Sequence, residues 1–558
     1  MKLNLGILSV FAFAVVFAGC HKDIVPGPEP EPEPLQHAFT KDSMAERIDD
    51  YLGNSYSCSV ERVSAGKTEI CISGVCQGSG NFRLVEIEPC DDVSEYLIYP
   101  RRHILKTDNG HFSLTLPRWE ERDGINYDRA LSKWAVILSS PEKDELVSSA
   151  RYADEITALR SASETPLKTK KGLGAGFGNL YINDLSELGI GSITMNLSLD
   201  DFFSAEALQG WTEYPYNGRL YHINLSRVSD IDRMTRAASS RGIVVAAIIL
   251  VPSTSPLADP ECNGGHYAMP DMTSAEAVNR YAAALEFLSE RYSSGVHGRI
   301  NHWIMHNEVS AAKEWTNMGE QPAARCFDRY VKSMRLCYNI VRQYDRNASV
   351  MVSLTHSWTR AENGHSAEYC SKSLLERLVR YSELEGDFRW GVAYHPYPVD
   401  LADPLFWKEG SLDCKYATFG PDAGYVTFYN PEVINAWILD RSHYYLNESK
   451  RLLFFSEQGT NTRSYSNEDM ENQAAGAAWF WKKIKDLEGV DAAQWHAHSD
   501  NREEFGLRLG LRNYDDYGPK PSWYVWKAAD TDEEEAVFSS YLPILGLQSW
   551  DALVRELN

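Results

Sequence analysis

The chain has 558 residues, more than one average domain, and its 43% hydrophobic and 24% charged residues are ordinary for a globular protein. Its 55 basic and 78 acidic residues give a formal net charge of −23. Because nucleic-acid binding needs a basic surface, this charge argues against DNA or RNA as a partner.

The first twenty residues have the pattern of a targeting segment. Lys2 is followed by an apolar run over residues 5–18 that is too short to span a membrane, and Cys20 comes directly after it. This stretch resembles a bacterial lipoprotein signal, which implies cleavage of residues 1–19 and lipidation of Cys20, although Phe17 stands where that pattern prefers Leu. The alternative is an ordinary secretory signal. We expect an extracytoplasmic protein, anchored through its lipid to a bacterial membrane, most simply the outer one.

Residues 20–39 form a linker in which Pro and Glu alternate, a composition that is extended and solvated. Residues 40–165 then contain short strand-like runs separated by turn signals, which predicts a small β-sandwich-like accessory domain. This domain is either a scaffold or a carbohydrate-binding module. The predicted strands are Thr68–Ser73, Phe82–Ile87, His111–Leu116 and Lys133–Leu138. One or two disulfides are expected among Cys58, Cys71, Cys76 and Cys90.

Strands and helices alternate from residue 170 to residue 531, ahead of a C-terminal tail of residues 532–558. Eight apolar strands, most of them followed by a helical segment, predict an α/β fold of the (β/α)8 TIM barrel type. A doubly wound open sheet is the alternative, but Gly172-x-Gly174-x-Gly176 lacks the spacing of a phosphate-binding loop. The predicted strands are Gly172–Phe177, Ser192–Leu197, Ile243–Val251, Ile300–Glu308, Ser349–Thr355, Trp390–His395, Leu452–Glu457 and Ala492–His496. The predicted helices are Asn179–Leu188, Ser274–Tyr292, Ala323–Tyr344, Asn430–Leu446, Asn467–Leu487 and Pro521–Ala529.

Two of the apolar strands end in an acid, Glu308 on the fourth and Glu457 on the seventh. Because the carboxyl ends of barrel strands meet at one face, we expect these carboxylates to lie together. A carboxyl group beside apolar walls has a raised pKa and can hold a proton near neutral pH. Other polar or aromatic side chains follow the strands at the same face and are candidate substrate contacts. They are Asn196, Asn307, His356, His395, Tyr397 and Trp495.

This arrangement resembles clan A of the glycoside hydrolases, which are retaining enzymes on a (β/α)8 barrel. The resemblance implies that Glu308, after Asn307, is the acid/base and that Glu457 is the nucleophile. It also implies that Asn307 binds a sugar hydroxyl, that His395 or Tyr397 lies beside the nucleophile, and that Trp495 stacks under the sugar. Two features depart from the clan: Val309 stands where many members have Pro, and no Arg is evident on the second strand.

The expected function is therefore hydrolysis of a glycosidic bond in an extracellular oligo- or polysaccharide by double displacement, without a cofactor or a metal. A first alternative is a non-catalytic carbohydrate-binding lipoprotein. A second is a metal-dependent hydrolase, suggested by the motif His496-x-His498-x-Asp500. Three long, aromatic-rich loops follow strands at the same face and are expected to form the walls of the site. They are Asp200–Arg227, Pro252–Ser274 and Val399–Tyr429.

Overall fold

The computed structural model of the chain describes residues 40–93, 101–140, 143–160, 163–174, 176, 178–361 and 367–553. The predicted signal peptide, Cys20, the linker and Phe177 lie outside the described residues. Within the described part of the chain, no helix is long and apolar enough to cross a membrane.

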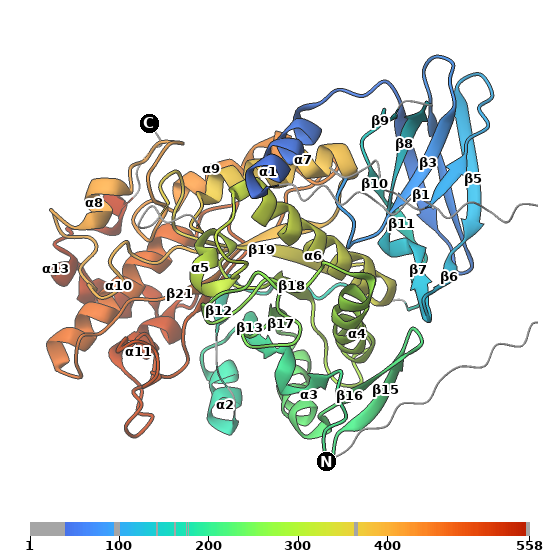
Figure 1. Cartoon of the computed structure of the whole chain (residues 1–558). Coiled ribbons are helices and arrows are strands. Elements are labelled where there is room, and N and C mark those ends of the chain that lie inside the picture. Colours follow the sequence, from blue (N-terminus) through green and yellow to red (C-terminus); the bar gives the residue numbers. More distant parts are fainter. Residues whose placement is uncertain are drawn as a thin grey trace, which may run out of the picture. The chain divides into compact units, whose positions relative to one another are not determined.

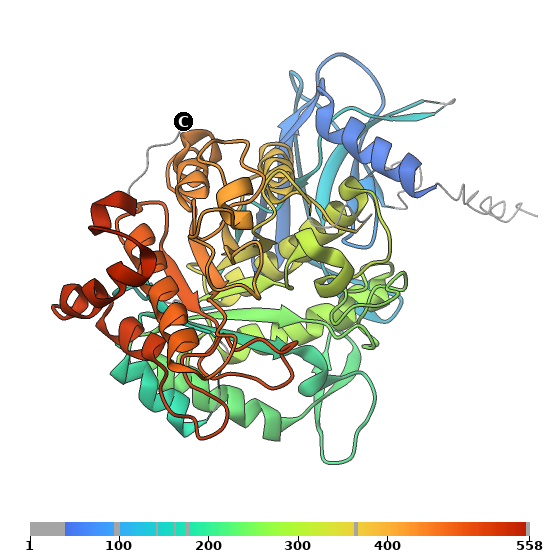
Figure 2. The ribbon, with the colours of Figure 1, turned by 90° about the vertical axis from the view of Figure 1, so that its left-hand side faces the viewer.

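Eight parallel strands close into a barrel, which confirms the predicted (β/α)8 fold (Figure 1). Strand β17 is buried at every position, as expected for a parallel strand covered on both faces. The helices lie outside the strands (Figure 2). In order around the barrel, the strands are β12 (Lys171–Leu173), β13 (Ser192–Ser198), β17 (Val244–Leu250), β18 (His302–Met305), β19 (Ser349–Thr355), β20 (Trp390–His395), β21 (Leu453–Gln458) and β22 (Ala492–Trp495).

Alternate residues of each strand face the barrel interior, where they form a small apolar cluster of their own. Ile248, Ile304 and Met351 are in register on three adjacent strands and belong to this cluster. The interior is therefore a packed core rather than a pore, as is usual for this fold. The cluster consists of Ala246, Ile248, Leu250, Ile304, Met351, Ala393, Phe454 and Ala492.

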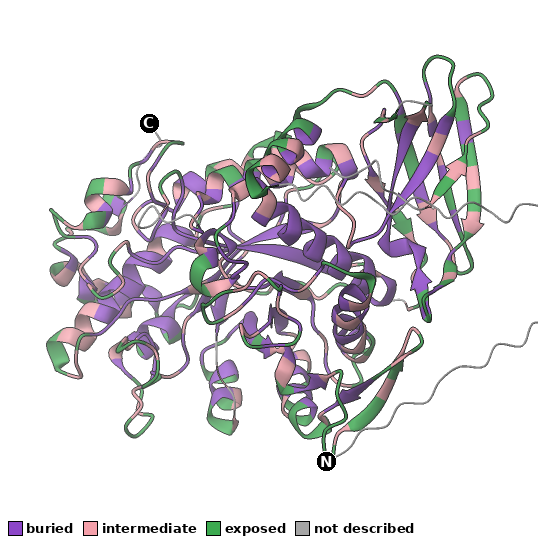
Figure 3. Ribbon diagram, in the orientation of Figure 1, coloured by how far each residue is buried: buried purple, intermediate pink, exposed green. Residues whose placement is uncertain are grey.

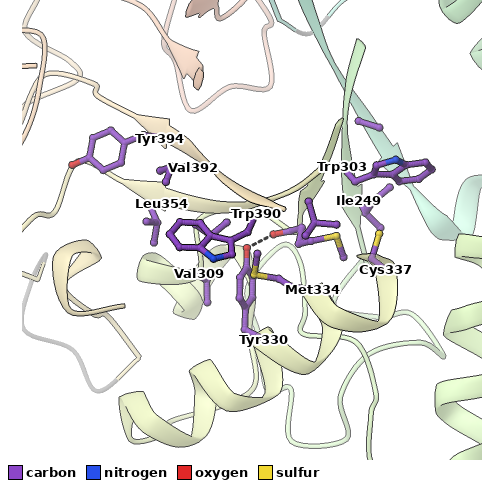
Figure 4. Packing of buried hydrophobic residues seen from close by; sticks show 14 of the residues in the cluster. Ile249, Trp303, Val309, Tyr330, Met334, Cys337, Leu354, Trp390, Val392 and Tyr394 are labelled. Carbon is purple, nitrogen blue, oxygen red and sulfur yellow. Dashed lines mark hydrogen bonds between the residues drawn. The ribbon is translucent and has the colours of Figure 1, made fainter. Parts of the chain in front are cut away.

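The outer faces of the strands pack on the surrounding helices, whose buried stripes are purple in Figure 3. Helix α6 (Ala323–Tyr344) covers β18 and β19 through Tyr330, whose hydroxyl donates to the Met305 carbonyl and accepts from the Ser353 amide at 3.0 Å (Figure 4). This bridge fixes the end of β18 just before Glu308. The remaining long barrel helices are α2 (Asn179–Glu187), α3 (Leu225–Ser239), α4 (Ala275–Arg291), α7 (Ser371–Glu385), α9 (Glu432–Leu439), α10 (Asn467–Ile484) and α11 (Pro521–Ala528).

The N-terminal strands form two facing sheets around a second core, which confirms the predicted small β domain. One sheet has the order β11-β1-β2-β5 and the other β10-β8-β3-β4, with β9 on β8. A buried ion pair of 2.6 Å from Lys133 to Glu385 joins β8 to helix α7. The strands are β1 (Ser59–Ala65), β2 (Glu69–Val75), β3 (Phe82–Ile87), β4 (Arg102–Ile104), β5 (His111–Pro117), β8 (Lys133–Ser139), β9 (Asp144–Leu146), β10 (Arg151–Tyr152) and β11 (Glu155–Ile156), and β6 (Trp119–Arg122) pairs with β7 (Ile125–Asp128) in a separate hairpin.

Several elements differ from the sequence predictions. The helices α1 (Lys41–Gly53), α3 and α7 were not predicted. The predicted helix Asn430–Leu446 is shorter, because the Asp440 side chain accepts bonds from the amide and hydroxyl of Ser442 and stabilises a turn directly after α9. The expected disulfides are not formed among the described cysteines, which are all free thiols. The segment after residue 531 contains two short helices, α12 (Glu534–Phe538) and α13 (Leu542–Leu545).

Candidate active site

Glu308 is presented by an unusual turn at the end of β18. His306 has φ 57° and Glu308 has φ 42°, so two non-glycine residues adopt the left-handed conformation within three positions. Such backbone costs free energy and persists where the surroundings fix it. Here the Glu308 amide donates to Ser353 Oγ at 2.9 Å, and His306 Nε2 lies 2.8 Å from Ser333 Oγ on helix α6. The turn is thus held from both sides.

The Glu308 carboxylate pairs with a buried histidine on another strand. His395, the last residue of β20, places Nδ1 2.7 Å from Glu308 Oε1, and its side chain is fully buried. Burial lowers the pKa of His395 to about 4. Glu457 opposes this shift, whereas His496 and His356 add to it. The imidazole is therefore neutral at neutral pH, and its contact with Glu308 is a hydrogen bond rather than an ion pair.

Glu457 sits on a β-bulge. Phe455 pairs with Ala493 and Gln458 pairs with Trp495, so two residues of β21 lie opposite one residue of β22. A bulge bends its strand and redirects the side chains on it. The next residue, Gly459, is required by close packing, because a Cβ at this position would lie 2.4 Å from the His496 carbonyl oxygen.

A tyrosine holds the Glu457 carboxylate. The Tyr397 hydroxyl donates to Glu457 Oε1 at 3.0 Å. Burial, with further contributions from Glu457 and Glu504, raises the pKa of Tyr397 well above its usual value, so the phenol keeps its proton. A bond from a neutral donor to a carboxylate favours the ionised carboxylate.

A third strand end supplies a cation to the same place. His496, directly after β22, lies 2.6 Å from Glu504 Oε1. Burial alone lowers the pKa of His496, but Glu457, the bond to Glu504 and Glu308 together raise it to about 9. The imidazolium and its bond in turn lower the pKa of Glu504, against the effect of burial. Glu308 and Glu457 therefore both lie near this one imidazole.

Comparison with known proteins places the barrel in a family. A sequence profile described as a family of unknown function (DUF5722) matches residues 163–553. The chain belongs to this family. No curated protein matches it.

Several solved structures are similar to this member of the family. One is a family 39 glycoside hydrolase from the gut symbiont Bacteroides cellulosilyticus WH2, with 13% identity and a TM-score of 0.42 over 86% of this chain and 83% of that chain. Another is a hyperthermophilic beta-glucosidase from Pyrococcus furiosus, with 14% identity and a TM-score of 0.42 over 66% of this chain and 87% of that chain. A third is the exo-beta-1,4-mannosidase Op5Man5 from an Opitutaceae bacterium, strain TAV5, with 13% identity and a TM-score of 0.39 over 68% of this chain and 63% of that chain.

Three of the predicted substrate contacts, Asn196, Asn307 and His356, lie close to the two carboxylates or face the barrel interior. Asn196 is in register with Ile248 of the interior cluster, so its side chain faces the barrel interior. Because Asn196 is exposed, it lies above the packed layer. Asn307 has a buried Oδ1 with no hydrogen-bond partner among the described residues. His356 is 9% exposed, its ring lies 5.4 Å from the tilted ring of Tyr425, and it helps to lower the pKa of His395.

One sequence prediction needs correction, and the structure decides between the alternatives of another. The indole of Trp495 is fully buried, donates from Nε1 to the Leu509 carbonyl at 2.9 Å and packs against Trp526. A covered ring cannot stack on a sugar, so the structure contradicts the role predicted for Trp495. The sequence predicted that His395 or Tyr397 lies beside the nucleophile. Only Tyr397 contacts Glu457, whereas His395 contacts Glu308.

The histidine-rich motif after β22 does not converge on one point. His496 pairs with Glu504, His498 places Nε2 2.8 Å from Asp184, and Asp500 accepts from Lys520 at 2.9 Å. Within the part of the chain that the structure describes, no group of three or more His, Cys, Asp or Glu side chains could hold a metal ion.

Sequence reasoning missed two residues that shape the site. Ser353 lies inside a buried strand, and nothing in its position distinguishes it from a core serine until its hydroxyl accepts from the Glu308 amide. Glu504 lies in an irregular loop among other acids, where only the fold brings it to His496. In both cases the informative signal is a tertiary contact, which a single sequence does not contain.

Proposed function

We propose that the protein is a retaining glycoside hydrolase in which Glu457 is the nucleophile and Glu308 is the acid/base. One observation carries the proposal. Carboxylates from the ends of β18 and β21 are each held by their own uncharged partner, His395 and Tyr397, and both act on the pKa of His496. Two carboxyl groups held by different partners in one environment support the separate acid/base and nucleophile roles of double displacement at a glycosidic bond.

In the first step, an oxygen of Glu457 attacks the anomeric carbon and the bond from that carbon to the leaving oxygen breaks. The Tyr397 hydroxyl orients the attacking carboxylate by donating to Oε1. Glu308 gives its proton to the leaving oxygen, and the departing alcohol takes both electrons of the broken bond. The neutral His395 stabilises the resulting Glu308 carboxylate by donating to Oε1.

In the second step, water attacks the anomeric carbon of the glycosyl–Glu457 ester. Glu308 takes a proton from this water, the ester bond breaks, and both carboxyl groups return to their starting states. The net configuration at the anomeric carbon is retained because two inversions occur. We assign the unpartnered Oδ1 of Asn307 to a substrate hydroxyl, since this buried acceptor has no protein donor among the described residues.

We also propose that the protein works outside the cytoplasm on a carbohydrate, anchored to the membrane through a lipid on Cys20. This part of the proposal rests on the sequence of residues 1–39 alone.

Product analysis and a matched set of variants test the chemistry. The wild type should release the retained anomer first, as seen by NMR at early time points. Glu457→Gln should lose nearly all turnover, and Glu308→Gln should lose it least on substrates with good leaving groups. Azide should restore Glu308→Ala by attacking the glycosyl intermediate. Glu503→Gln, an exposed neighbour of Glu504, is the control and should behave as wild type. Wild-type turnover by Glu457→Gln would contradict the assignment.

A further inference from the structure

An exposed group of aromatic rings lies at the carboxyl end of the barrel and has no part in the chemistry above. We call His266, Tyr267, Trp315 and Phe505 the rim cluster. They come from the loop after β17, from helix α5 (Ala312–Trp315) and from the loop after β22. The rings of His266 and Trp315 stack at 5.1 Å, those of Tyr267 and Trp315 at 6.2 Å, and the edge of Phe505 meets His266 at 5.5 Å.

The rim cluster is rigidly built. The amides of His266 and Tyr267 both donate to the Glu314 carbonyl, at 2.7 and 3.2 Å, and His266 Nδ1 lies 3.1 Å from Glu314 Oε2. Gly265 precedes them with φ 74°, and a Cβ there would lie 2.6 Å from the Lys313 carbonyl oxygen. The loop after β17 is therefore pinned against α5, and the rings are held in place before any ligand arrives.

The rim cluster is attached to both sides of the catalytic centre. The Thr316 hydroxyl, next to Trp315, donates to the Asn307 carbonyl, so α5 is tied to the turn that presents Glu308. Phe505 follows Glu504, whose side chain reaches His496. Burial raises the pKa of Tyr267, and the nearby Glu457 carboxylate raises it further. The rings thus border the reacting groups.

A purely structural role does not account for Phe505. Its side chain is 70% exposed, whereas a ring that served to pack its loop would be covered. Exposed aromatic surface beside a site with convergent polar groups is typical of a ligand contact. Flat rings suit the apolar C–H face of a pyranose, which offers area without charge.

We propose that the rim cluster is a binding subsite for the sugar on the leaving-group side of the cleaved bond. The inference rests on the proposed function, because Glu308 would protonate the leaving oxygen and Trp315 belongs to the segment that follows Glu308. The substrate class is then an oligo- or polysaccharide whose second pyranose stacks on Phe505, rather than a glycoside with a small leaving group.

The test compares two substrates with the same reacting sugar and different leaving groups. Paired disaccharides and glycosyl fluorides of glucose, mannose, xylose and glucuronic acid supply this contrast, since fluoride is too small to reach the rim. Phe505→Ala should lower kcat/KM about tenfold on the disaccharide that the wild type hydrolyses, and less than twofold on the matching fluoride. Phe505→Tyr should recover most of the loss. Tyr524→Ala, which removes a ring that is 53% exposed on α11, is the control and should match wild type on both substrates.

The outcomes separate this inference from the proposed function. Equal losses on the disaccharide and the fluoride, or no loss on either, would overturn the subsite. If the wild type hydrolyses no substrate, the proposed function fails, and binding of the same disaccharides is measured by saturation-transfer NMR. Binding that Phe505→Ala weakens about tenfold would still support the subsite. Binding that is unaffected, or the absence of any binding, would overturn it.

Discussion

Tyr397 and Glu457 are joined by a hydrogen bond of 3.0 Å from the phenol to Oε1, although they are 60 positions apart in the chain. The bond links the segment after β20 to the bulge of β21. The orientation of the proposed nucleophile therefore depends on this phenolic donor.

Tyr397→Phe removes that proton and keeps the ring. Hydrogen bonds to charged groups contribute about 1.5–3 kcal/mol, so kcat/KM should fall by roughly 10- to 150-fold. Steady-state kinetics on the best substrate measures the effect. Tyr394→Phe is a matched control, because the Tyr394 hydroxyl is buried and has no partner among the described residues. A similar loss in both variants would mean that any change of a buried phenol disturbs the strand.

The pH dependence of stability should reveal the cation at His496. An unfolded histidine titrates near pH 6.5, whereas the folded pKa of His496 is about 9. The folded chain therefore keeps a proton that the unfolded chain loses between these values. This contribution to the free energy of unfolding is complete below pH 6.5 and is lost as the pH rises through 9.

Thermal unfolding between pH 6.5 and 9.5 checks this expectation. The Tm of the wild type should fall more steeply over this range than the Tm of His496→Gln. Glu504→Gln removes one of the groups that raise the pKa of His496, so the His496-dependent fall in its Tm should also begin near pH 6.5 but should end at a lower pH and be smaller in total than that of the wild type. Parallel curves for the three proteins would show that His496 carries no extra proton in the folded state.

Gly459 offers a test of how tightly the site is packed. A methyl group at this position would lie 2.4 Å from the His496 carbonyl oxygen, so Gly459→Ala must displace the backbone beside Glu457. We expect a loss of about 1–3 kcal/mol in the free energy of unfolding and reduced turnover. Gly53→Ala, where nothing lies within 4 Å, should leave both unchanged. Chemical denaturation distinguishes the two variants.

The proposed lipid anchor depends on one thiol. Wild-type protein produced in a bacterium should incorporate labelled palmitate and partition with the detergent phase of Triton X-114. Cys20→Ala should do neither, while its globular part keeps its activity. A secretory signal without lipidation predicts instead that both proteins stay in the aqueous phase.

The sequence was sufficient for the barrel because most of its strands are predominantly apolar runs. The predicted strand Ser349–Thr355 coincides with β19, and Trp390–His395 with β20. Such strands are buried on both faces, so their composition differs sharply from that of the loops around them. Glu308 and Glu457 were predicted from the same pattern, because a carboxylate at the end of an apolar run is unusual.

The partners of those acids could not be assigned from the sequence. His395 and Tyr397 are two positions apart, and only the path of the chain after β20 decides which one reaches Glu457 and which one reaches Glu308. Trp495 shows the same limit. A tryptophan at a strand end can face the substrate or the helices, and here Trp526 of α11 covers it. Helix α3 was not predicted, and only its first three residues fall within the predicted loop Asp200–Arg227.

Glu504 and Phe505 are neighbours in the chain, but their side chains have different surroundings. The Glu504 side chain contacts His496, whereas the Phe505 side chain is exposed to solvent. In the proposed subsite, one short loop would therefore connect the ring that contacts a sugar to the acid that pairs with His496. A substitution that shifts this loop would loosen Glu504 and make His496 a weaker base. Redesign of specificity at this rim would consequently alter the pH profile as well, and the two properties should co-evolve.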